Sequence, residues 1–487
     1  MIISPRQGRY LLSILVAFVM VVGLLGRANA LDALTRLDRV LLHHHPLRGV
    51  AYQQKSVPGA PALEPMLTAT TVTKFAIDGD PQINVRSDLH PIDVDGDGRF
   101  EYLQHNGYRL IRVYTIDGIK LWEADNPVGR VHRQYNHRDT LAVVDIDGDG
   151  GQDVIHCWAV PDPKAPDGFA KHLMVRDGRT GRIVRDVVLA GQRAVRVADE
   201  CHIAAFRVPG MAKPLVLVSF KAPATAGCAM NYVDTFSQTV AFDTDLNRLW
   251  SRTTCDAGHY AWPLDQNNDG LAEAIFVGKY KFAPNGTLLC TLAGWPKDHV
   301  DSMAIGDFDP AVPGFEVVAV GLTGTRAYRA SDCAPTWSLP LSKLPNPQFV
   351  VAAALDPVNS GKVLAIRSKP EPTGPNRLWF VSPSGAVLRY HAGTEFTELP
   401  MQNAALDANP GTDELVGAFG DVMDRFGNLR LSRAWYWNQQ TLSATEAALA
   451  PPYQWSSRPL VYDVDGDGRD EIVTWGRYAI VVGKVVP

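Results

Sequence analysis

Four copies of a nine-residue aspartate loop are the feature that most constrains the fold of this 487-residue chain. They span residues 93–101, 145–153, 265–273 and 463–471. In each copy, oxygen-bearing side chains stand at positions 1, 3, 5 and 9, and a glycine stands at position 6. That glycine lets the backbone turn so that the carbonyl of position 7 can join the other oxygens. This ligand pattern is typical of a site for a hard cation and predicts calcium.

The predicted ligands are four side chains and one main-chain carbonyl in each loop. They are Asp93, Asp95, Asp97, Arg99 and Glu101; Asp145, Asp147, Asp149, Gly151 and Asp153; Asp265, Asn267, Asp269, Leu271 and Glu273; and Asp463, Asp465, Asp467, Arg469 and Glu471. An EF-hand would continue into a helix, whereas these loops run directly into strand-like segments such as residues 472–475. We therefore expect calcium-stabilised β-hairpins. The alternative is a set of ordinary Asp/Gly turns, because both residues favour turns for backbone reasons.

Degenerate copies of the loop fill the intervals between the full ones. Together the copies start near residues 93, 145, 206, 265, 307, 356, 407 and 463, which gives eight units of about fifty residues. Each unit continues with an apolar strand, a turn and a strand that often ends in tryptophan, as in residues 113–122 and 240–250. Four short strands per fifty residues is the period of a β-propeller blade, and closing the ring protects the sheet edges. The predicted fold class is all-β, a single eight-bladed propeller over residues 66–487, with strand 71–77 completing the last blade.

The N-terminal segment is predicted to be a signal peptide over residues 1–30. Arg6 and Arg9 precede an apolar run over residues 11–26, and Ala28-Asn-Ala30 offers a small-residue cleavage site. Residues 31–65 are predicted to form a helix and a linker outside the repeats. The expected localisation is secreted or periplasmic, with no membrane span after cleavage. The alternative is an uncleaved anchor.

Cysteine usage and charge add constraints on compartment and partners. All six cysteines lie between residues 157 and 333, so an oxidising compartment would allow three disulfides in any of fifteen pairings. The alternative is that some stay as buried thiols. The formal charge of −5 falls by three, to −8, once the arginines of the leader are removed. The chain has no one-sided basic stripe, so we expect no nucleic-acid partner, and we expect a monomer.

A second group of ligand-type side chains stands just before the loops. Six or eight residues before the first loop aspartate stand His137 and Asp139, His259, and His299 and Asp301. The period-two spacing of His299 and Asp301 places them on the same face of a strand. Because inner strands of a propeller open onto a central channel, this register predicts that imidazoles and carboxylates from several blades converge there. The alternative for each histidine is a hydrogen-bonded structural role.

From about Leu89 to its C-terminus, the chain resembles a known family. The aspartate loops, the eight-unit period, the Asp-Gly turns before Leu-Trp, and residues 299–316 with Gly306-Asp-Phe-Asp-Pro310 are similar to rhamnogalacturonan lyases of polysaccharide lyase family 11. Those lyases are secreted, calcium-dependent, eight-bladed propellers that cleave the pectin backbone. The resemblance implies that His259, His299, Asp301 and Glu316 hold a calcium in the lyase cleft. Such a cation would neutralise a uronate carboxylate, so that a base can abstract the C5 proton and the O4 sugar leaves by β-elimination.

The chain departs from that family at three places. Where the lyases carry Asn-Gly-Thr-Lys before the final loop, this chain has Tyr453-Gln-Trp455-Ser-Ser-Arg458. Arg458 is the candidate for the cationic role, and Trp455 is the candidate for stacking on a sugar ring. A family histidine after the glutamate is replaced by the apolar residues 317–321, and Asp139 stands where the family has threonine.

Two functions from different classes stay open. The first is a lyase acting on a uronate-containing polysaccharide, with His259, His299, Asp301, Glu316 and Arg458 in its site; it predicts a deep polar cleft. The second is a noncatalytic calcium-loop propeller for adhesion, binding of a surface glycan or envelope assembly, in which the same residues are buried in ordinary hydrogen bonds. A quinoprotein dehydrogenase is a third alternative, since such enzymes also combine eight blades with Gly-x-x-x-Trp turns. The aspartate loops are foreign to that class, and no Gly-x-Ser-x-Gly or His-Glu-x-x-His motif is present.

Overall fold

The structure is a computed structural model that describes most of the repeat region. The described residues are 68–76, 88–106, 110–126, 141–164, 168–189, 201–220, 238–255, 258, 260–296, 298–353, 362–368, 376–393, 402–404, 406, 414–416, 422–423, 429–431, 460–464, 469–475 and 479–486. The predicted signal peptide and the helix with its linker lie outside them. So do His137, Asp139, His259, Tyr453, Trp455, Arg458, Asp465 and Asp467.

The described strands form eight four-stranded antiparallel sheets, called blades 1 to 8 below. Blades 1 to 4 are β2 (Asp88–Ile92), β3 (Glu101–Asn106), β4 (Leu110–Tyr114), β5 (Lys120–Asp125); β6 (Leu141–Val144), β7 (Asp153–Pro161), β8 (Phe169–Arg176), β9 (Ile183–Val188); β10 (Cys201–Phe206), β11 (Leu215–Phe220), β12 (Gln238–Phe242), β13 (Arg248–Thr253); and β14 (Ala261–Leu264), β15 (Ala274–Val277), β16 (Tyr280–Phe282), β17 (Leu288–Thr291).

Blades 5 to 8 follow in the same manner. They are β18 (Ser302–Gly306), β19 (Glu316–Gly321), β20 (Gly324–Arg329), β21 (Pro335–Leu339); β22 (Pro347–Ala353), β23 (Val363–Ser368), β24 (Asn376–Val381), β25 (Val387–Gly393); β26 (Gln402–Ala404), β27 (Glu414–Val416), β28 (Val422–Met423), β29 (Leu429–Leu431); and β30 (Leu460–Tyr462), β31 (Glu471–Trp475), β32 (Ala479–Val486) with β1 (Thr68–Ala76).

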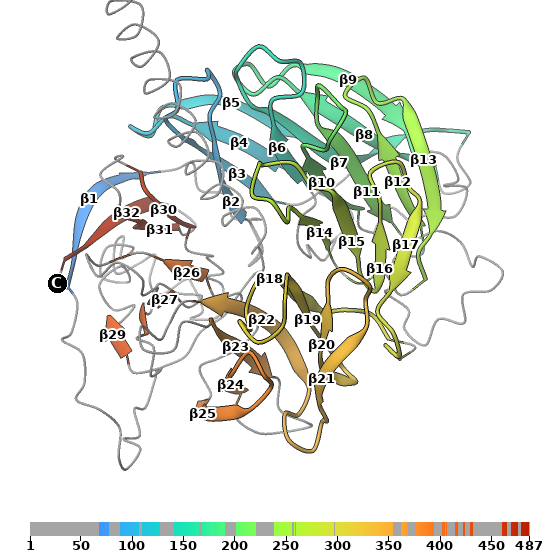
Figure 1. Ribbon diagram of the computed structural model, residues 1–487. Coiled ribbons are helices and arrows are strands. Elements are labelled where there is room, and N and C mark those ends of the chain that lie inside the picture. Colours follow the sequence, from blue (N-terminus) through green and yellow to red (C-terminus); the bar gives the residue numbers. More distant parts are fainter. Residues whose placement is uncertain are drawn as a thin grey trace, which may run out of the picture.

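The blades surround a common centre, with strands such as β2, β14, β18 and β22 toward the inside and β13, β17, β21 and β25 toward the outside (Figure 1). Inner strands of successive blades contact one another from β6 through β10, β14, β18, β22, β26 and β30 to β2, and blades 1 and 2 share one apolar core. β1 closes the ring by pairing with β32, from Thr68 opposite Val486 to Ala76 opposite Ala479. The predictions of an all-β propeller and of its closing strand are confirmed.

The hydrophobic core lies between neighbouring blades. β11 and β19 are buried at every position, because each second strand packs on a blade at either side and has no solvent-facing surface. The outer strand β5 instead alternates between exposed and buried residues. Among the described residues, no helix has the length and apolar character needed to cross a membrane.

Tryptophans of the fourth strands join blade 1 to blade 2, blade 3 to blade 4 and blade 5 to blade 6. The indole Nε1 of Trp122 donates to the Gly178 carbonyl at 2.7 Å, that of Trp250 to Pro284 at 2.8 Å, and that of Trp337 to Pro383 at 2.7 Å. Each acceptor lies in the turn before the fourth strand of the following blade. A glycine at positive φ in the same turn lies under the indole, where a Cβ would collide with the ring, as at Gly286 beneath Trp250. The tryptophan and glycine signals of the repeat therefore act across blades.

At two other boundaries, the fourth strand and the turn of the next blade are joined by a different kind of interaction. Arg185 of blade 2 bonds to Asp245 in the turn of blade 3, at 3.0 and 3.2 Å. Cys290 of blade 4 forms a disulfide with Cys333 in the turn of blade 5. Cys333 has a φ of 59° and stands four residues before Trp337, as Gly286 stands four before Cys290. A covalent bond thus replaces the indole–glycine contact between blades 4 and 5.

The other cysteines have different states. Cys255 is also disulfide-bonded, and Cys228 lies outside the described residues. Cys157 and Cys201 are buried thiols. The structure therefore contains both of the states that the sequence left open, disulfides and buried thiols.

Candidate functional site

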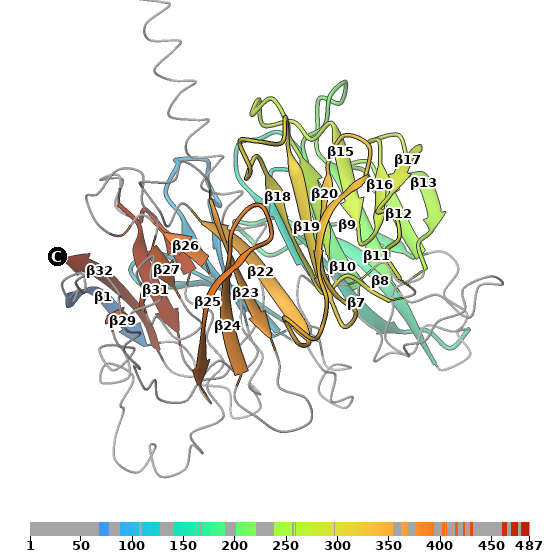
Figure 2. The same ribbon diagram turned by 60° about the horizontal axis from the view of Figure 1, so that its bottom comes forward.

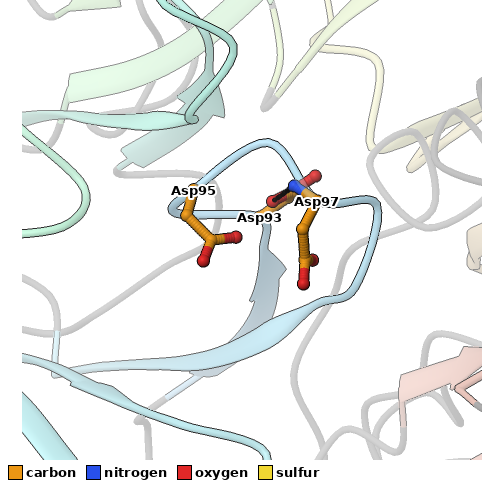
Figure 3. A group of neighbouring side chains, drawn as sticks. All are labelled: Asp93, Asp95 and Asp97. Atoms are coloured by element: carbon orange, nitrogen blue, oxygen red, sulfur yellow. Dashed lines mark hydrogen bonds between the residues drawn. The ribbon is translucent and has the colours of Figure 1, made fainter.

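The aspartate loops join the first and second strands of blades 1, 2, 4 and 8. In the first loop, Asp93, Asp95 and Asp97 each place a carboxylate oxygen within 4.8 Å of the others, with the carboxylates of Asp95 and Asp97 on the same side of the turn (Figure 3). Two other loops contain equivalent groups: Asp145, Asp147 and Asp149, and Asp265, Asp269 and Glu273. Three predicted loops therefore bring their acidic side chains together.

The loop backbone adopts the shape that the glycines predict. At the sixth position, Gly98, Gly150 and Gly270 have φ values of 83°, 97° and 81°, a region that side chains with a Cβ rarely occupy. The first aspartate caps the turn: the Gly96 and Gly98 amides donate to the Asp93 carboxylate at 2.7 and 2.9 Å. These bonds hold the first carboxylate in place beside the third and fifth.

The ninth residue ties each loop to the strand that follows. One oxygen of Glu101, Asp153, Glu273 and Glu471 accepts the amide of the second loop residue, at 2.8 to 3.2 Å. The other oxygen of Glu273, Oε1, is buried without a hydrogen-bond partner among the described residues. A buried carboxylate oxygen without a donor is costly unless a cation or water satisfies it. This atom therefore fits a cation ligand.

Electrostatics in the loops also favours a cation. Burial raises the pKa of Asp153 to about 7, and the charges of Asp147 and Asp177 add to the effect, against two backbone hydrogen bonds. Burial similarly raises the pKa of Glu101 and Asp265, with repulsion from neighbouring loop carboxylates. A bound cation would favour the charged form of each carboxylate and so lower these pKa values.

The remaining predicted loop ligands are less fully defined. Asp463, Arg469 and Glu471 are described, and Glu471 Oε1 lies 3.5 Å from Lys484 Nζ. In the third loop, Asn267 Nδ2 donates to Asp269 Oδ2 at 3.2 Å. The carbonyl-bearing residues Arg99, Gly151 and Leu271 occupy the seventh position of their turns.

A second cluster, Asp298, His299 and Asp301, lies just before the inner strand β18. His299 Nε2 is 3.1 Å from Asp301 Oδ1, and His299 Nδ1 is 3.3 Å from Asp298 Oδ1. The three residues are only 5 to 7% exposed. Burial alone would lower the pKa of His299, but its bonds to Asp298 and Asp301 raise it to about 10. The imidazole is therefore a cation held between two carboxylates.

Neighbouring elements fix this cluster in place. The Asp301 amide donates to the Val320 carbonyl at 2.9 Å, and the Asp298 carboxylate accepts the His299 amide at 2.9 Å. Gly321 is required opposite, because a Cβ there would collide with the His299 carbonyl oxygen. Asp298 Oδ2 is buried and has no hydrogen-bond partner among the described residues. This oxygen is therefore a further atom of the cluster that can coordinate a cation.

The next blade contributes a residue that the sequence reasoning missed. Gln348 of β22 donates from Nε2 to Asp301 Oδ2 at 3.1 Å and to Asn346 Oδ1 at 3.0 Å. Gln348 stands eight residues before Asp356, as His299 stands eight before Asp307. The eight-residue spacing before the loop aspartate therefore also marks Gln348, although its side chain is an amide rather than a histidine or a carboxylate.

The preceding blade also reaches the cluster. A Cβ at Gly258 would collide with the carbonyl oxygen of Val300, so the chain at residue 258 lies against the segment that carries His299 and Asp301. His259 follows directly in sequence but lies outside the described residues, as do His137 and Arg458. Chain segments that precede blades 4, 5 and 6 thus meet at one place.

The structure does not place Glu316 in this cluster. Glu316 lies opposite Gly306 at the far end of β18, roughly 16 Å along the strand from Asp301. Its Oε2 accepts the amide of Phe308 at 2.7 Å, as ninth-position carboxylates do in the full loops. The expectation that Glu316 shares one calcium with His299 and Asp301 does not agree with this register. Glu316 belongs to the degenerate loop of blade 5.

The two groups of acidic residues lie on opposite faces of the ring. Because blades 1 to 7 have four antiparallel strands joined in order, and blade 8 has three such strands with β1 as the fourth, each inner strand begins at the same face. The His299 cluster precedes β18 on that face, whereas the aspartate loops follow inner strands on the other.

Comparisons with known proteins agree with this architecture. No family model matches the chain. It is 27% identical over 299 residues to the rhamnogalacturonan exolyase YesX of Bacillus subtilis (strain 168), covering 52% of this chain and 47% of the relative. It is 26% identical over 275 residues to the rhamnogalacturonan endolyase YesW of the same organism, covering 47% of this chain and 42% of the relative. The chain resembles rhamnogalacturonan lyases.

Solved structures extend the similarity in fold to most of the propeller. The crystal structure of YesX superposes with a TM-score of 0.55 at 18% identity, covering 87% of this chain and 75% of that chain. The rhamnogalacturonan lyase PL11 of Bacillus licheniformis gives 0.56 at 18% identity, with 86% and 76% covered. At these identities the likeness shows the fold alone. The chain spans less than half the length of the curated relatives that it matches in sequence.

Proposed function

We propose that this protein is a secreted, calcium-binding propeller that cleaves uronate-containing polysaccharide by β-elimination. The observation that carries the proposal is the buried Asp298–His299–Asp301 cluster, which lies where segments before blades 4, 5 and 6 meet. The relatives that the chain resembles are named as rhamnogalacturonan lyases. The leader-like residues 1–30 support export.

Calcium would serve two separate purposes in this protein. In the loops it would be held by carboxylates such as Asp93, Asp95 and Asp97, where it offsets their mutual repulsion and fixes the turn. On the opposite face, Asp298 Oδ2 and Asp301 supply the oxygen atoms that a hard cation prefers. A cation bound there would supply neutralisation of the substrate carboxylate, which is worth several kcal/mol.

The residues around that face would orient both cation and sugar. Gln348 holds one oxygen of Asp301, which keeps the carboxylate aligned with His299. His259 and Arg458 are the further candidates, the first as a ligand and the second as a partner for the uronate charge. Abstraction of the C5 proton then requires a base from the same face, and the O4 sugar leaves as the double bond forms.

The test is a lyase assay on rhamnogalacturonan that follows the unsaturated uronate product by ultraviolet absorbance, with calcium and with chelator. The decisive variant is His299→Gln, because glutamine already occupies the equivalent register of blade 6 at Gln348. Glu316→Gln is the matched control, since it alters a buried carboxylate on the opposite face. We expect His299→Gln to lose at least about a hundredfold in rate, roughly 2.7 kcal/mol of transition-state stabilisation, and Glu316→Gln to keep most activity. No product from folded, calcium-loaded protein would exclude the lyase proposal.

A second candidate function is a noncatalytic propeller that binds a surface glycan. The observation that favours it is the burial of His299 and Asp301, which are 7% and 5% exposed and bond to each other. Binding of rhamnogalacturonan fragments without turnover, measured by calorimetry on the same two variants, would support this alternative. Identical affinity in His299→Gln and in the wild-type protein would place the glycan elsewhere.

A further inference from the structure

Two buried cysteines face each other across the boundary between blades 2 and 3. Cys157 lies on β7 and Cys201 begins β10, and these strands lie side by side in both views (Figures 1 and 2). Their side chains belong to one apolar core, at 1% and 0% exposure. The Cys157 thiol lies close enough to that of Cys201 for the two groups to interact. Packing between blades therefore brings two thiols into contact that are 44 positions apart in the sequence.

The surroundings of the pair fit a covalent bond better than a metal site. Structural zinc sites take four ligands, and among the described residues no third histidine, cysteine or carboxylate joins these thiols in a metal-binding group. Burial raises the pKa of the Cys157 thiol, which makes the pair inert once the blades have closed. Oxidation must therefore precede or accompany the packing of blade 3 on blade 2.

We propose that Cys157 and Cys201 form a disulfide that joins blades 2 and 3 in the exported protein. In the reaction, one thiolate attacks a disulfide-bearing oxidant and forms a mixed disulfide with it; the second thiolate then attacks the protein sulfur of that mixed disulfide, and the oxidant's sulfur leaves as a thiolate that takes up a proton. The new S–S bond forms as two thiol protons are released and the oxidant leaves as a reduced dithiol. On the outer side of the same boundary, the exposed ion pair of Arg185 and Asp245 joins the two blades. An exposed ion pair contributes little to stability by itself.

The bond would match the one already present elsewhere in the ring. The Cys290–Cys333 disulfide joins blades 4 and 5, so both bonds would connect consecutive blades. Because such a bond restricts the unfolded chain, it would stabilise the blade 2–3 boundary independently of calcium and of any activity. It goes beyond the proposed function and does not depend on it.

The experiment uses the full chain exported to the periplasm of a bacterial host. The protein is unfolded in guanidinium with N-ethylmaleimide and without reductant, then digested and analysed by mass spectrometry. We expect a cross-linked peptide pair containing Cys157 and Cys201, and no maleimide on either residue. Maleimide on both residues in most of the protein would overturn the proposal, and so would a link from either of them to another cysteine.

A thermal measurement tests the stabilising role of the bond. We expect reductant to lower the Tm of the wild-type protein more than that of Cys157→Ala/Cys201→Ala, because the variant has one bond fewer to lose. Equal Tm shifts in the wild-type protein and in the double variant would show that the bond does not stabilise the protein. If the double variant does not fold, Cys157→Ser replaces it, and the mass spectrometry of the wild-type protein still decides whether the bond exists.

Discussion

The two faces of this propeller are built on different principles. The face with the aspartate loops repeats one motif in blades 1, 2, 4 and 8, each time with the same bond to the ninth residue. The opposite face carries Asp298, His299 and Asp301 before blade 5, and Gln348 at the start of blade 6 bonds to Asp301. Within the described residues, one face therefore carries a set of equivalent turns, and the other carries one cluster of this kind.

This difference suggests that the loops serve the stability of the protein and that the cluster serves its activity. Repeated turns each reinforce their own blade, so their effects should add with the number of loops. The cluster occurs once among the described residues, so these residues can meet a specific chemical requirement. We therefore expect metal removal to act mainly on folding, and substitutions at the cluster to act mainly on activity.

The largest expected effect is the loss of stability when calcium is removed. Each site saturated at a hundred times its dissociation constant contributes about 2.7 kcal/mol, so four loops would contribute roughly 10 kcal/mol. We expect chelator to lower the Tm by about 10 °C or more, measured by differential scanning calorimetry. An unchanged Tm would show that the loops are ordinary Asp/Gly turns.

A smaller effect is expected from His299→Gln, and its size should depend on calcium. Because the pKa of His299 is raised to about 10, the imidazolium persists at neutral pH and its stabilising contribution is lost only as the pH rises through that value. Without calcium, removing it leaves two buried carboxylates without a counter-charge, at a cost of about 3 kcal/mol. With calcium, we expect less than about 1 kcal/mol. Denaturant unfolding in both buffers measures the difference, and equal costs would contradict a cation at this cluster.

Glu273→Gln should weaken one loop only. Its Oε1 is buried without a partner among the described residues, and an amide is a poorer ligand for a hard cation. We expect a loss of about 2 kcal/mol in calcium and almost none in chelator, by the same unfolding measurement. Glu123→Gln is the matched control, because Glu123 is a partly exposed glutamate on the outer strand β5. A loss of equal size in chelator would assign Glu273 a role unrelated to metal.

The smallest effect is expected from pH at His156, which lies on β7 opposite Leu141, the first residue of β6. Burial, followed by the nearby charges of Arg176 and His105, lowers the pKa of His156 well below its usual value. The unfolded chain therefore binds the proton more tightly, and stability falls as the pH drops below about 6.5, by about 1.4 kcal/mol per unit. His156→Gln, which can still accept from Arg176 Nε, should reduce this slope. His172→Gln serves as the control, and equal slopes in the two variants would contradict the prediction.

Sequence spacing predicted much of the fold because the repeat is local. The turn residues, the glycines at positive φ and the alternation of strands all act within about ten residues, so the loops and the all-β propeller follow from the chain itself. The closing strand followed from the shortness of the last unit. The tryptophan signal was also visible, although its partners were not, because Gly178, Pro284 and Pro383 lie in the following blades.

By itself, then, the sequence determined the period, the ring and the composition of the loops. Only the tertiary structure decided which distant residues meet: Gln348 bonds to Asp301, and Cys290 bonds to Cys333, at a turn position that is glycine in blades 1, 2, 4 and 6 and Leu246 in blade 3. The physical reason is distance along the chain. Contacts between blades join segments some fifty residues apart, and they depend on how each strand packs against the next blade rather than on any local pattern.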